Sequence, residues 1–432
     1  MNLLKASMIL LFLSGGIQRV DAHRQDSLAA KNYVEEINRL AKHAKVQKAF
    51  DRIVQLEAET KANHILLTEI PAPPFGESKR AEQYAKMLKP LGVDSVWIDS
   101  VGNVIAKRKG KDATKTVLIE GHLDTVFPEG TDVRVVAKGD TLAAPGIADD
   151  TRALAVLLTI LKAMQAADIK TTADVLFVGT VGEEGQGDLR GMKQLFGQSG
   201  LQIDSHIGLD GTATDRVVNR GVGSHRYRIT YKSAGGHSYG SFGMVNTHVA
   251  LGKAIAYWSK DADAYIAQPG PKTTYSVSVI GGGTSVNSIP FESWMEVDMR
   301  SESNDRLKQV DDYLQTALQK ALEEVNSNKK IGENMTLDVE MMGDRPSGGA
   351  DLTVPLVQRM MAVIQRVDQI PKLSASSTNS NIPLSLGIPS ITIGSGGVGG
   401  GAHSLGEWFL NKEGYIGVQN ALLVLLAEAG IE

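Results

Sequence analysis

The chain has 432 residues, with 45 basic and 49 acidic side chains, a formal net charge of −4 at pH 7 and no cysteine. The absence of cysteine excludes disulfides, thiolate metal sites and cysteine nucleophiles, so any metal must be bound by histidine and carboxylate. A hydrophobic share of 42% is ordinary for a globular protein of two or three domains, and the small negative charge gives no reason to expect nucleic acid or an anionic membrane as a partner.

The first 22 residues have the pattern of a signal peptide. Lys5 supplies a positive n-region, residues 8–13 form an apolar run, and Val20-Asp21-Ala22 is a small-residue cleavage site. The alternative is an uncleaved N-terminal helix, but the apolar run is far shorter than the ~20 residues that span a bilayer. We therefore expect cleavage after Ala22 and an exported protein, periplasmic or secreted, with no membrane anchor.

The mature chain begins with a helix-rich stretch and continues as strands that alternate with helices. Strands separated by helices at this spacing predict an α/β fold, a mostly parallel sheet flanked by helices. The expected elements are helices over 29–69 and 78–88, a strand pair over 96–99 and 103–107, a strand over 117–120, a helix over 153–164 and a strand over 175–181.

A second unit begins near Gly221, where the pattern changes to β-α-β-β-α-β, the order of a small two-layer sandwich. Its expected elements are strands over 225–232, 275–280, 294–300 and 335–341 and helices over 247–258 and 305–324. Afterwards the chain returns to α/β character, with a helix over 356–367 and a strand over 390–393. We therefore expect a catalytic domain over 23–220 and 345–432, interrupted by an inserted α+β domain over 221–344.

Residues suited to catalysis or metal binding stand at five places, four of them where a predicted strand ends. They are His122 with Asp124, Asp149 with Asp150, Glu183 with Glu184, Asp210, and His403. In open α/β sheets ligands bind beyond the carboxyl ends of the strands, so we expect these residues to converge. Taken singly, His122, Asp210 and His403 are more often structural than functional.

His122 and Asp124 lie two residues apart after the strand over 117–120. In an extended chain such residues point the same way, so Asp124 could accept the second ring N–H of His122 and fix its tautomer, as metal-binding histidines require. The alternative is a histidine at a strand end beside a capping aspartate.

The two doubled carboxylates are the stronger signals. Asp149 and Asp150 precede a predicted helix, where one aspartate is a good cap but a second adds repulsion unless a cation is near. Glu183 and Glu184 follow an apolar strand, and a buried carboxylate pair also needs a compensating cation. Because successive side chains diverge, one glutamate can bind metal while the other faces a reacting water.

Charge counting favours two metal ions over one. Two Zn²⁺ ions, the carboxylates of Asp149, Glu184 and Asp210, one bridging hydroxide and two neutral histidines sum to zero charge. Three carboxylates and two histidines exceed the tetrahedral requirement of a single zinc. The Gly394-x-Gly396-x-x-Gly399 segment matches a dinucleotide fingerprint only in its glycines, since no helix opens there within a βαβ unit, and we expect no dinucleotide.

The motifs form an ordered set that resembles the aminoacylase, carboxypeptidase G and peptidase T family of di-zinc hydrolases. The Asp149-Asp150 pair and the segment over 396–408 look most similar to the peptidase T-like branch. The segments that carry the resemblance are Gly121-His122-Leu123-Asp124-Thr125-Val126, Gly146-Ile147-Ala148-Asp149-Asp150, Glu183-Glu184-Gly185, Asp210 and Gly401-Ala402-His403-Ser404.

The resemblance implies a role for each site residue. His122 and Asp210 would bind one zinc, Glu184 and His403 the other, and Asp149 would bridge them. Glu183 would be the general base, with Asp124 orienting His122. In the inserted lid and dimerisation domain, His237 would reach a substrate site, and Asn287 and Arg300 would hold a substrate carboxylate. Thr378-Asn379 departs from the family, where an aspartate often follows the threonine, which affects the expected substrate preference.

We therefore expect an exported exopeptidase with two Zn²⁺ ions per chain, or Co²⁺ or Mn²⁺, that hydrolyses an amide bond in short peptides as a homodimer through residues 221–344. Deacylation of N-acyl amino acids is the alternative within the same chemistry, because both reactions need the same metal site. A metal-binding protein without catalysis is a more remote alternative, since such proteins usually lack the base that Glu183 supplies here.

Overall fold

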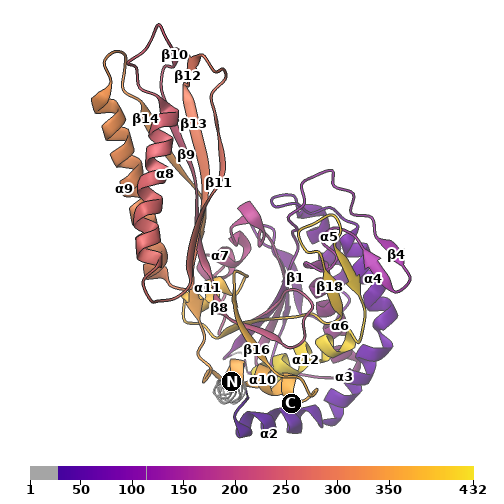
Figure 1. Ribbon diagram of the computed structural model, residues 1–432. Coiled ribbons are helices and arrows are strands. Elements are labelled where there is room, and N and C mark those ends of the chain that lie inside the picture. Colours follow the sequence, from indigo (N-terminus) through magenta and orange to yellow (C-terminus); the bar gives the residue numbers. More distant parts are fainter. Residues whose placement is uncertain (1–27, 113) are drawn as a thin grey trace, which may run out of the picture.

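The computed structural model describes residues 28–112 and 114–432, so the predicted signal peptide lies outside the described residues. The chain begins with three helices, α2 (Lys31–Ala41), α3 (Ala44–Gln55) and α4 (Glu57–Thr68), which curve around one side of the main body (Figure 1). In α3 the apolar residues Val46, Phe50 and Ile53 recur at helical spacing and are all buried. Prolines follow α4 and stop helix formation there.

The centre of the main body is a nine-stranded sheet with the order β1-β2-β6-β3-β7-β17-β8-β15, and β16 also pairs with β8. The strands β6, β3, β7 and β17 are parallel to one another, which confirms the predicted parallel core. Both edges contain antiparallel pairs, so the complete sheet is mixed. The bounds are β1 (Ser95–Ile98), β2 (Val104–Arg108), β3 (Thr116–His122), β6 (Asp174–Thr180), β7 (Ser205–Leu209), β8 (Arg216–Gly221), β15 (Gly348–Gly349), β16 (Lys372–Ser376) and β17 (Ser390–Ile393).

Helices cover both faces of this sheet, because its central strands are apolar on both sides. Val117 and Ile119 of β3 face the larger hydrophobic cluster, whereas Leu118 faces a second cluster on the opposite side. The buried helix α6 packs against β3. The helices of the main body beyond α4 are α5 (Ser78–Leu88), α6 (Thr151–Ala166), α7 (Arg190–Gly197), α10 (Pro355–Gln365), α11 (Asn381–Ser385) and α12 (Tyr415–Ala429), with a 3₁₀ turn over Gly185–Gly187.

Residues 223–345, called the inserted unit below, form a separate layer pair that projects from the main body as a long arm (Figure 1). Its antiparallel sheet has the order β11-β13-β9-β14, and two helices pack on one face over a hydrophobic cluster of their own. Burial alternates residue by residue along β13, as a sheet with one covered face requires. The elements are β9 (Gly223–Lys232), α8 (Thr247–Ile266), β11 (Thr273–Gly282), β13 (Glu292–Ser301), α9 (Asn304–Asn328) and β14 (Thr336–Arg345), the predicted β-α-β-β-α-β order.

Two further small sheets were absent from the sequence expectations. A two-stranded sheet, β10 (Gly236–His237) with β12 (Ser288–Ile289), closes the far tip of the inserted unit. A four-stranded sheet has the order β18-β19-β5-β4 and consists of β4 (Val136–Lys138), β5 (Thr141–Ala143), β18 (Val398–Gly400) and β19 (Trp408–Leu410). The loop that carries His403 connects β18 and β19 of this sheet. Among the described residues, no helix combines the length and the apolar character needed to cross a bilayer.

Candidate metal centre

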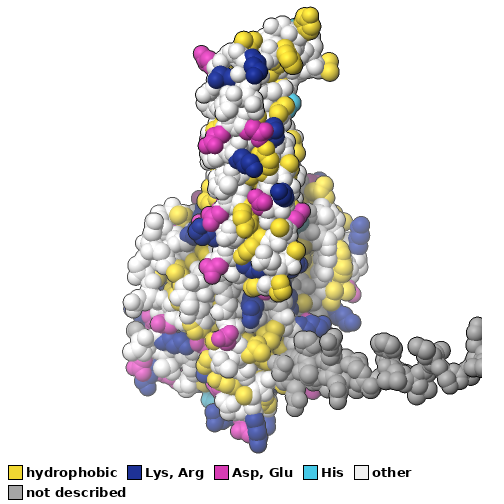
Figure 2. All heavy atoms as spheres, turned by 60° about the vertical axis from the view of Figure 1, so that its left-hand side comes forward, with side chains coloured by type: hydrophobic (Ala, Val, Ile, Leu, Met, Phe, Trp, Pro, Cys, Tyr) yellow, Lys and Arg dark blue, Asp and Glu magenta, His cyan; other side chains and the backbone are white. Residues whose placement is uncertain are grey.

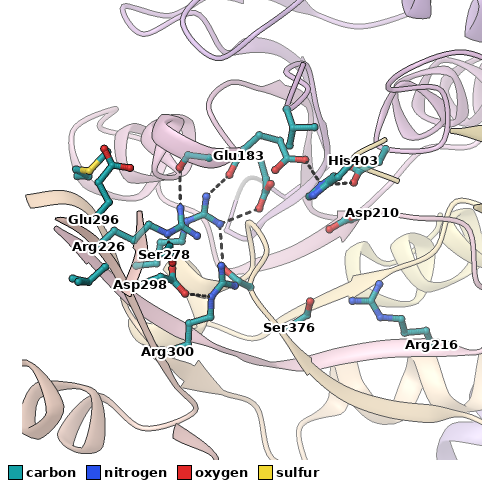
Figure 3. Close-up of a pocket in the computed structure, with 18 residues that line it drawn as sticks. Glu183, Asp210, Arg216, Arg226, Ser278, Glu296, Asp298, Arg300, Ser376 and His403 are labelled. Carbon is teal, nitrogen blue, oxygen red and sulfur yellow. Dashed lines mark hydrogen bonds and ion pairs between the residues drawn. The ribbon is translucent and has the colours of Figure 1, made fainter. Parts of the chain in front are cut away.

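The five predicted metal-binding residues converge at the carboxyl edge of the parallel strands. His122 is the last residue of β3, Asp210 follows β7, and Glu184 lies in the turn after β6. Asp149 precedes α6, and His403 comes from the loop between β18 and β19. Asp149, Glu184, Asp210 and His403 line a cleft of about 580 Å³ between the main body and the inserted unit (Figure 3).

Asp149 lies at the centre of this group and faces one imidazole with each carboxylate oxygen. Its Oδ1 is 3.0 Å from Nε2 of His122, and its Oδ2 is 3.2 Å from Nε2 of His403. The same His403 nitrogen is 2.9 Å from Oε1 of Glu184. A carboxylate that divides its two oxygens between two histidines has the arrangement needed to bridge two cations.

The chemistry of this donor set fits divalent metal ions. One ligand atom each from His122, Asp149 and Glu184 lies within 4.8 Å of the others, a group able to hold a metal. Burial and the neighbouring Asp149 carboxylate raise the pKa of Asp210 to about 6, which reflects the cost of crowding carboxylates away from water. Imidazole and carboxylate ligands suit zinc and related divalent ions, which would compensate these charges.

We expected the carboxylate of Asp124 to accept a hydrogen bond from His122, but it does not. The ring nitrogen Nδ1 of His122 is 2.9 Å from the backbone oxygen of Asp124 but 3.7 Å from its carboxylate. The reason is a bend at Leu123, which ends the extended conformation that the expectation required. The carboxylate instead accepts hydrogen bonds from the backbone N–H groups of Glu183 and Glu184, at 3.0 and 2.8 Å. Asp124 thus holds the turn that carries both glutamates.

We expect Asp124→Asn to weaken metal affinity roughly 10–100-fold, the range seen when the support of a metal ligand is removed. An asparagine side chain has only one oxygen, so one of the two backbone N–H groups at Glu183 and Glu184 loses its acceptor. Competition with a metal-binding dye measures the affinity. A variant that binds metal as tightly as the wild-type protein would show that this turn needs no such anchor.

Glu183 lies beside these groups with one oxygen unbonded. Its Oε1 is buried without a hydrogen-bond partner in the described part of the chain, and Arg345 Nη1 is 3.5 Å away. Arg345 Nη2 also donates to the Glu183 backbone oxygen at 2.5 Å. Burial raises the pKa of Glu183 to about 8, against the opposing effect of the Arg345 guanidinium. A carboxylate with a raised pKa and a free oxygen suits proton transfer near neutral pH.

Two supporting residues, Glu407 and Arg345, were not identified from the sequence, and a third, Asp150, was identified there without this role. Glu407 accepts backbone hydrogen bonds from Gly146, Ala148 and Asp149, and so fixes the loop before α6. Arg345, the last residue of β14, holds Glu183 as described above. Asp150 accepts from the backbone N–H of His122 at 3.0 Å. Glu407 and Arg345 stand alone in the sequence, and no local pattern marks them.

The predicted substrate residues are divided between the two ends of the inserted unit. Arg300 lines the cleft, where its Nε donates to Asp298 at 2.8 Å. His237 and Asn287 lie at the far tip, where Ser238 N–H donates to the Asn287 backbone oxygen and His237 pairs with Ser288 (Figure 1). Neither His237 nor Asn287 is among the residues that line the cleft.

Asn379, where the sequence departs from the family pattern, is buried outside the cleft lining. Its amide donates to the carboxylate of Glu120 at 2.8 Å and to Thr180 at 2.9 Å. The departure therefore lies among the hydrogen bonds that support the ends of the central strands.

Comparison with known proteins identifies the family. The chain is 24% identical to YqjE of Bacillus subtilis over 341 residues (74% of this chain and 86% of the relative) and 22% identical to a succinyl-diaminopimelate desuccinylase of Corynebacterium glutamicum over 258 residues (59% and 69%). Its fold is similar to that of aminopeptidase PepT from Bacillus cereus, with a TM-score of 0.68 at 18% identity (86% of this chain and 98% of that chain). The model of peptidase family M20/M25/M40 matches residues 118–427, well over half of the chain. The chain therefore belongs to peptidase family M20/M25/M40 and is a metallopeptidase.

Proposed function

We propose that this protein is an exported two-metal exopeptidase that hydrolyses an amide bond in short peptides. The observation that carries the proposal is the pairing of Asp149 with both His122 and His403, beside a buried Glu183 oxygen that has no hydrogen-bond partner among the described residues. The position of Asp149 between the two histidines suits two cations, and the Glu183 oxygen supplies a base next to them.

In this proposal His122 and Asp210 would hold one ion, Glu184 and His403 would hold the other, and Asp149 would contribute to both. Bound Zn²⁺, Co²⁺ or Mn²⁺ would polarise the scissile carbonyl and lower the pKa of a water molecule. Glu183 accepts the proton of the attacking water and returns it to the leaving amine. Arg345 holds the Glu183 backbone, and Asp124 holds the turn.

The substrate is proposed to be small and to carry a free carboxylate. The cleft has a volume of about 580 Å³ and is bordered by the inserted unit, and Arg300 presents a guanidinium to it. Deacylation of N-acyl amino acids remains the second candidate, because one relative is described as a succinyl-diaminopimelate desuccinylase. Assays of di- and tripeptides beside N-acetyl amino acids distinguish the exopeptidase from the deacylase. The protein is first stripped of metal and then given zinc, cobalt or manganese. Hydrolysis of none of these would favour a binding protein without catalysis.

We expect the purified protein to bind two divalent ions per chain. Five ligand side chains exceed the need of one tetrahedral ion, and Asp149 offers one oxygen to each side of the site. Elemental analysis against protein concentration measures the ratio. Full activity with no more than one ion per chain would contradict the two-metal site.

The proposed export predicts the N-terminus of the mature protein. Because Ala22 ends the cleavage pattern, N-terminal sequencing of the exported protein should start at His23. Cytoplasmic protein that retains Met1 would contradict both export and cleavage.

The inserted unit is proposed to form a homodimer that brings His237 to the cleft of the partner. The tip that carries His237 also exposes large hydrophobic side chains, visible at the far end of the arm in Figure 2, and Tyr239, Phe242 and Val286 are 88%, 85% and 103% exposed. Exposed apolar side chains gathered at one place are typical of an interaction surface. Asn287, next to Val286, would enter the partner's cleft with His237.

A further inference from the structure

Outside the metal-binding group, pairing of the charged side chains in and next to the cleft leaves two positive charges uncompensated. Most of its other charges are paired: Arg345 lies 3.5 Å from Glu183, and Glu296 is paired with Arg228 at 2.7 Å. On the inserted unit, the carboxylate of Asp298 forms ion pairs with two guanidinium groups, those of Arg226 and Arg300. Its Oδ1 is 2.9 Å from Arg226 and its Oδ2 is 2.8 Å from Arg300, so this trio has a net charge of +1.

The second surplus charge is Arg216, at the start of β8 in the main body. Arg216 lines the cleft, and Figure 3 shows its guanidinium directed toward Ser376, with no interaction drawn to another lining residue. Its Nη1 lies beside Gly211, directly after Asp210. Within residues 28–112 and 114–432 its side chain forms no ion pair and no hydrogen bond.

The two surplus charges lie on different walls of the cleft, one on the inserted unit and one on the main body. We propose that the cleft selects substrates with two carboxylates, one bound by Arg300 and the other by Arg216. This inference rests on the proposed function, which sets the position of the scissile amide. The second carboxylate would belong either to an acidic side chain of a peptide or to a dicarboxylic acyl group, and Arg216 offers the same paired N–H donors to both.

The test compares two substrate pairs that differ mainly in one negative charge. Ala-Glu is compared with Ala-Gln, and N-succinyl-alanine with N-butyryl-alanine, on metal-loaded protein. We expect kcat/KM to favour the doubly charged member of at least one pair by about 10-fold or more, the effect of a charge-assisted hydrogen bond. The pair that shows the preference identifies the source of the carboxylate.

Arg216→Ala should reduce this selectivity ratio toward one, mainly through KM, and Arg216→Lys should retain part of it. Arg220→Ala is the matched control, because Arg220 is exposed on the same strand but does not line the cleft. An alternative role for Arg216 is only to balance the charge of Asp210. Lost metal in Arg216→Ala with an unchanged selectivity ratio would establish that role and overturn the proposal.

A binding measurement separates this inference from the proposed function. Calorimetry on metal-loaded Glu183→Gln, with and without Arg216→Ala, compares the affinities of the same four compounds without turnover. One outcome is that the wild-type protein hydrolyses none of the four compounds, while the doubly charged ones bind more tightly only when Arg216 is present. In that case the exopeptidase proposal fails and the inference stands. Equal affinities and equal kcat/KM values within both pairs would overturn the inference.

Discussion

Glu183→Gln should lower kcat by about 10²–10⁴-fold while the protein keeps its full metal content. The amide has nearly the same shape as the carboxylate but cannot accept the proton of water. The substituted group does not contact the histidines, because Glu183 Oε1 has no hydrogen-bond partner in the described part of the chain and Arg345 is the charged group beside it. Steady-state kinetics and elemental analysis of the same preparation measure the two quantities.

Glu184→Gln is the matched control for this substitution. Its Oε1 lies 2.9 Å from Nε2 of His403, so the change should reduce metal content and lose activity for that reason. Excess metal should restore part of the activity of Glu184→Gln and none of the activity of Glu183→Gln. The reverse pattern would mean that the two glutamates have exchanged roles.

His237→Ala should lower kcat by about 10²–10³-fold with unchanged folding and metal content. The expected size is that of removing one hydrogen-bond donor to the negative oxygen that develops in amide hydrolysis. His237 lies at the tip of the inserted unit, away from the cleft of its own chain, so in the proposed homodimer the donor would come from the partner subunit (Figure 1). An unchanged kcat would contradict a catalytic role for His237.

Mixing two inactive variants tests the exchange between subunits. A dimer of one His237→Ala chain and one Glu183→Gln chain has one complete site if His237 acts across the interface, because the first chain keeps Glu183 and receives His237 from the second. If His237 acts within its own chain, the mixture has no complete site. Sedimentation as a monomer at full activity would contradict the dimer itself.

The sequence was sufficient to predict that the candidate metal-binding residues lie together at one edge of the sheet. His122 ends an apolar strand, Glu184 and Asp210 each follow one, and the carboxyl ends of neighbouring parallel strands meet at one edge of a sheet. The order of the inserted unit was also predictable, because alternating burial in strands and helical spacing in α8 and α9 are local patterns. These predictions depended on periodicities that a few residues reveal.

Contacts between distant segments were decided only by the tertiary structure. Glu407 binds the loop of Asp149, and Arg345 binds Glu183, across 258 and 162 positions of the chain. Asp124 shows the same limit at short range, since one bend at Leu123 turned its carboxylate from His122 to the backbone of Glu183 and Glu184. Local sequence indicated the type of the longer helices and strands, but not the short strands of the two small sheets. Which backbone groups a buried carboxylate then meets depends on how the elements pack, because each buried N–H must find an acceptor wherever the fold provides one.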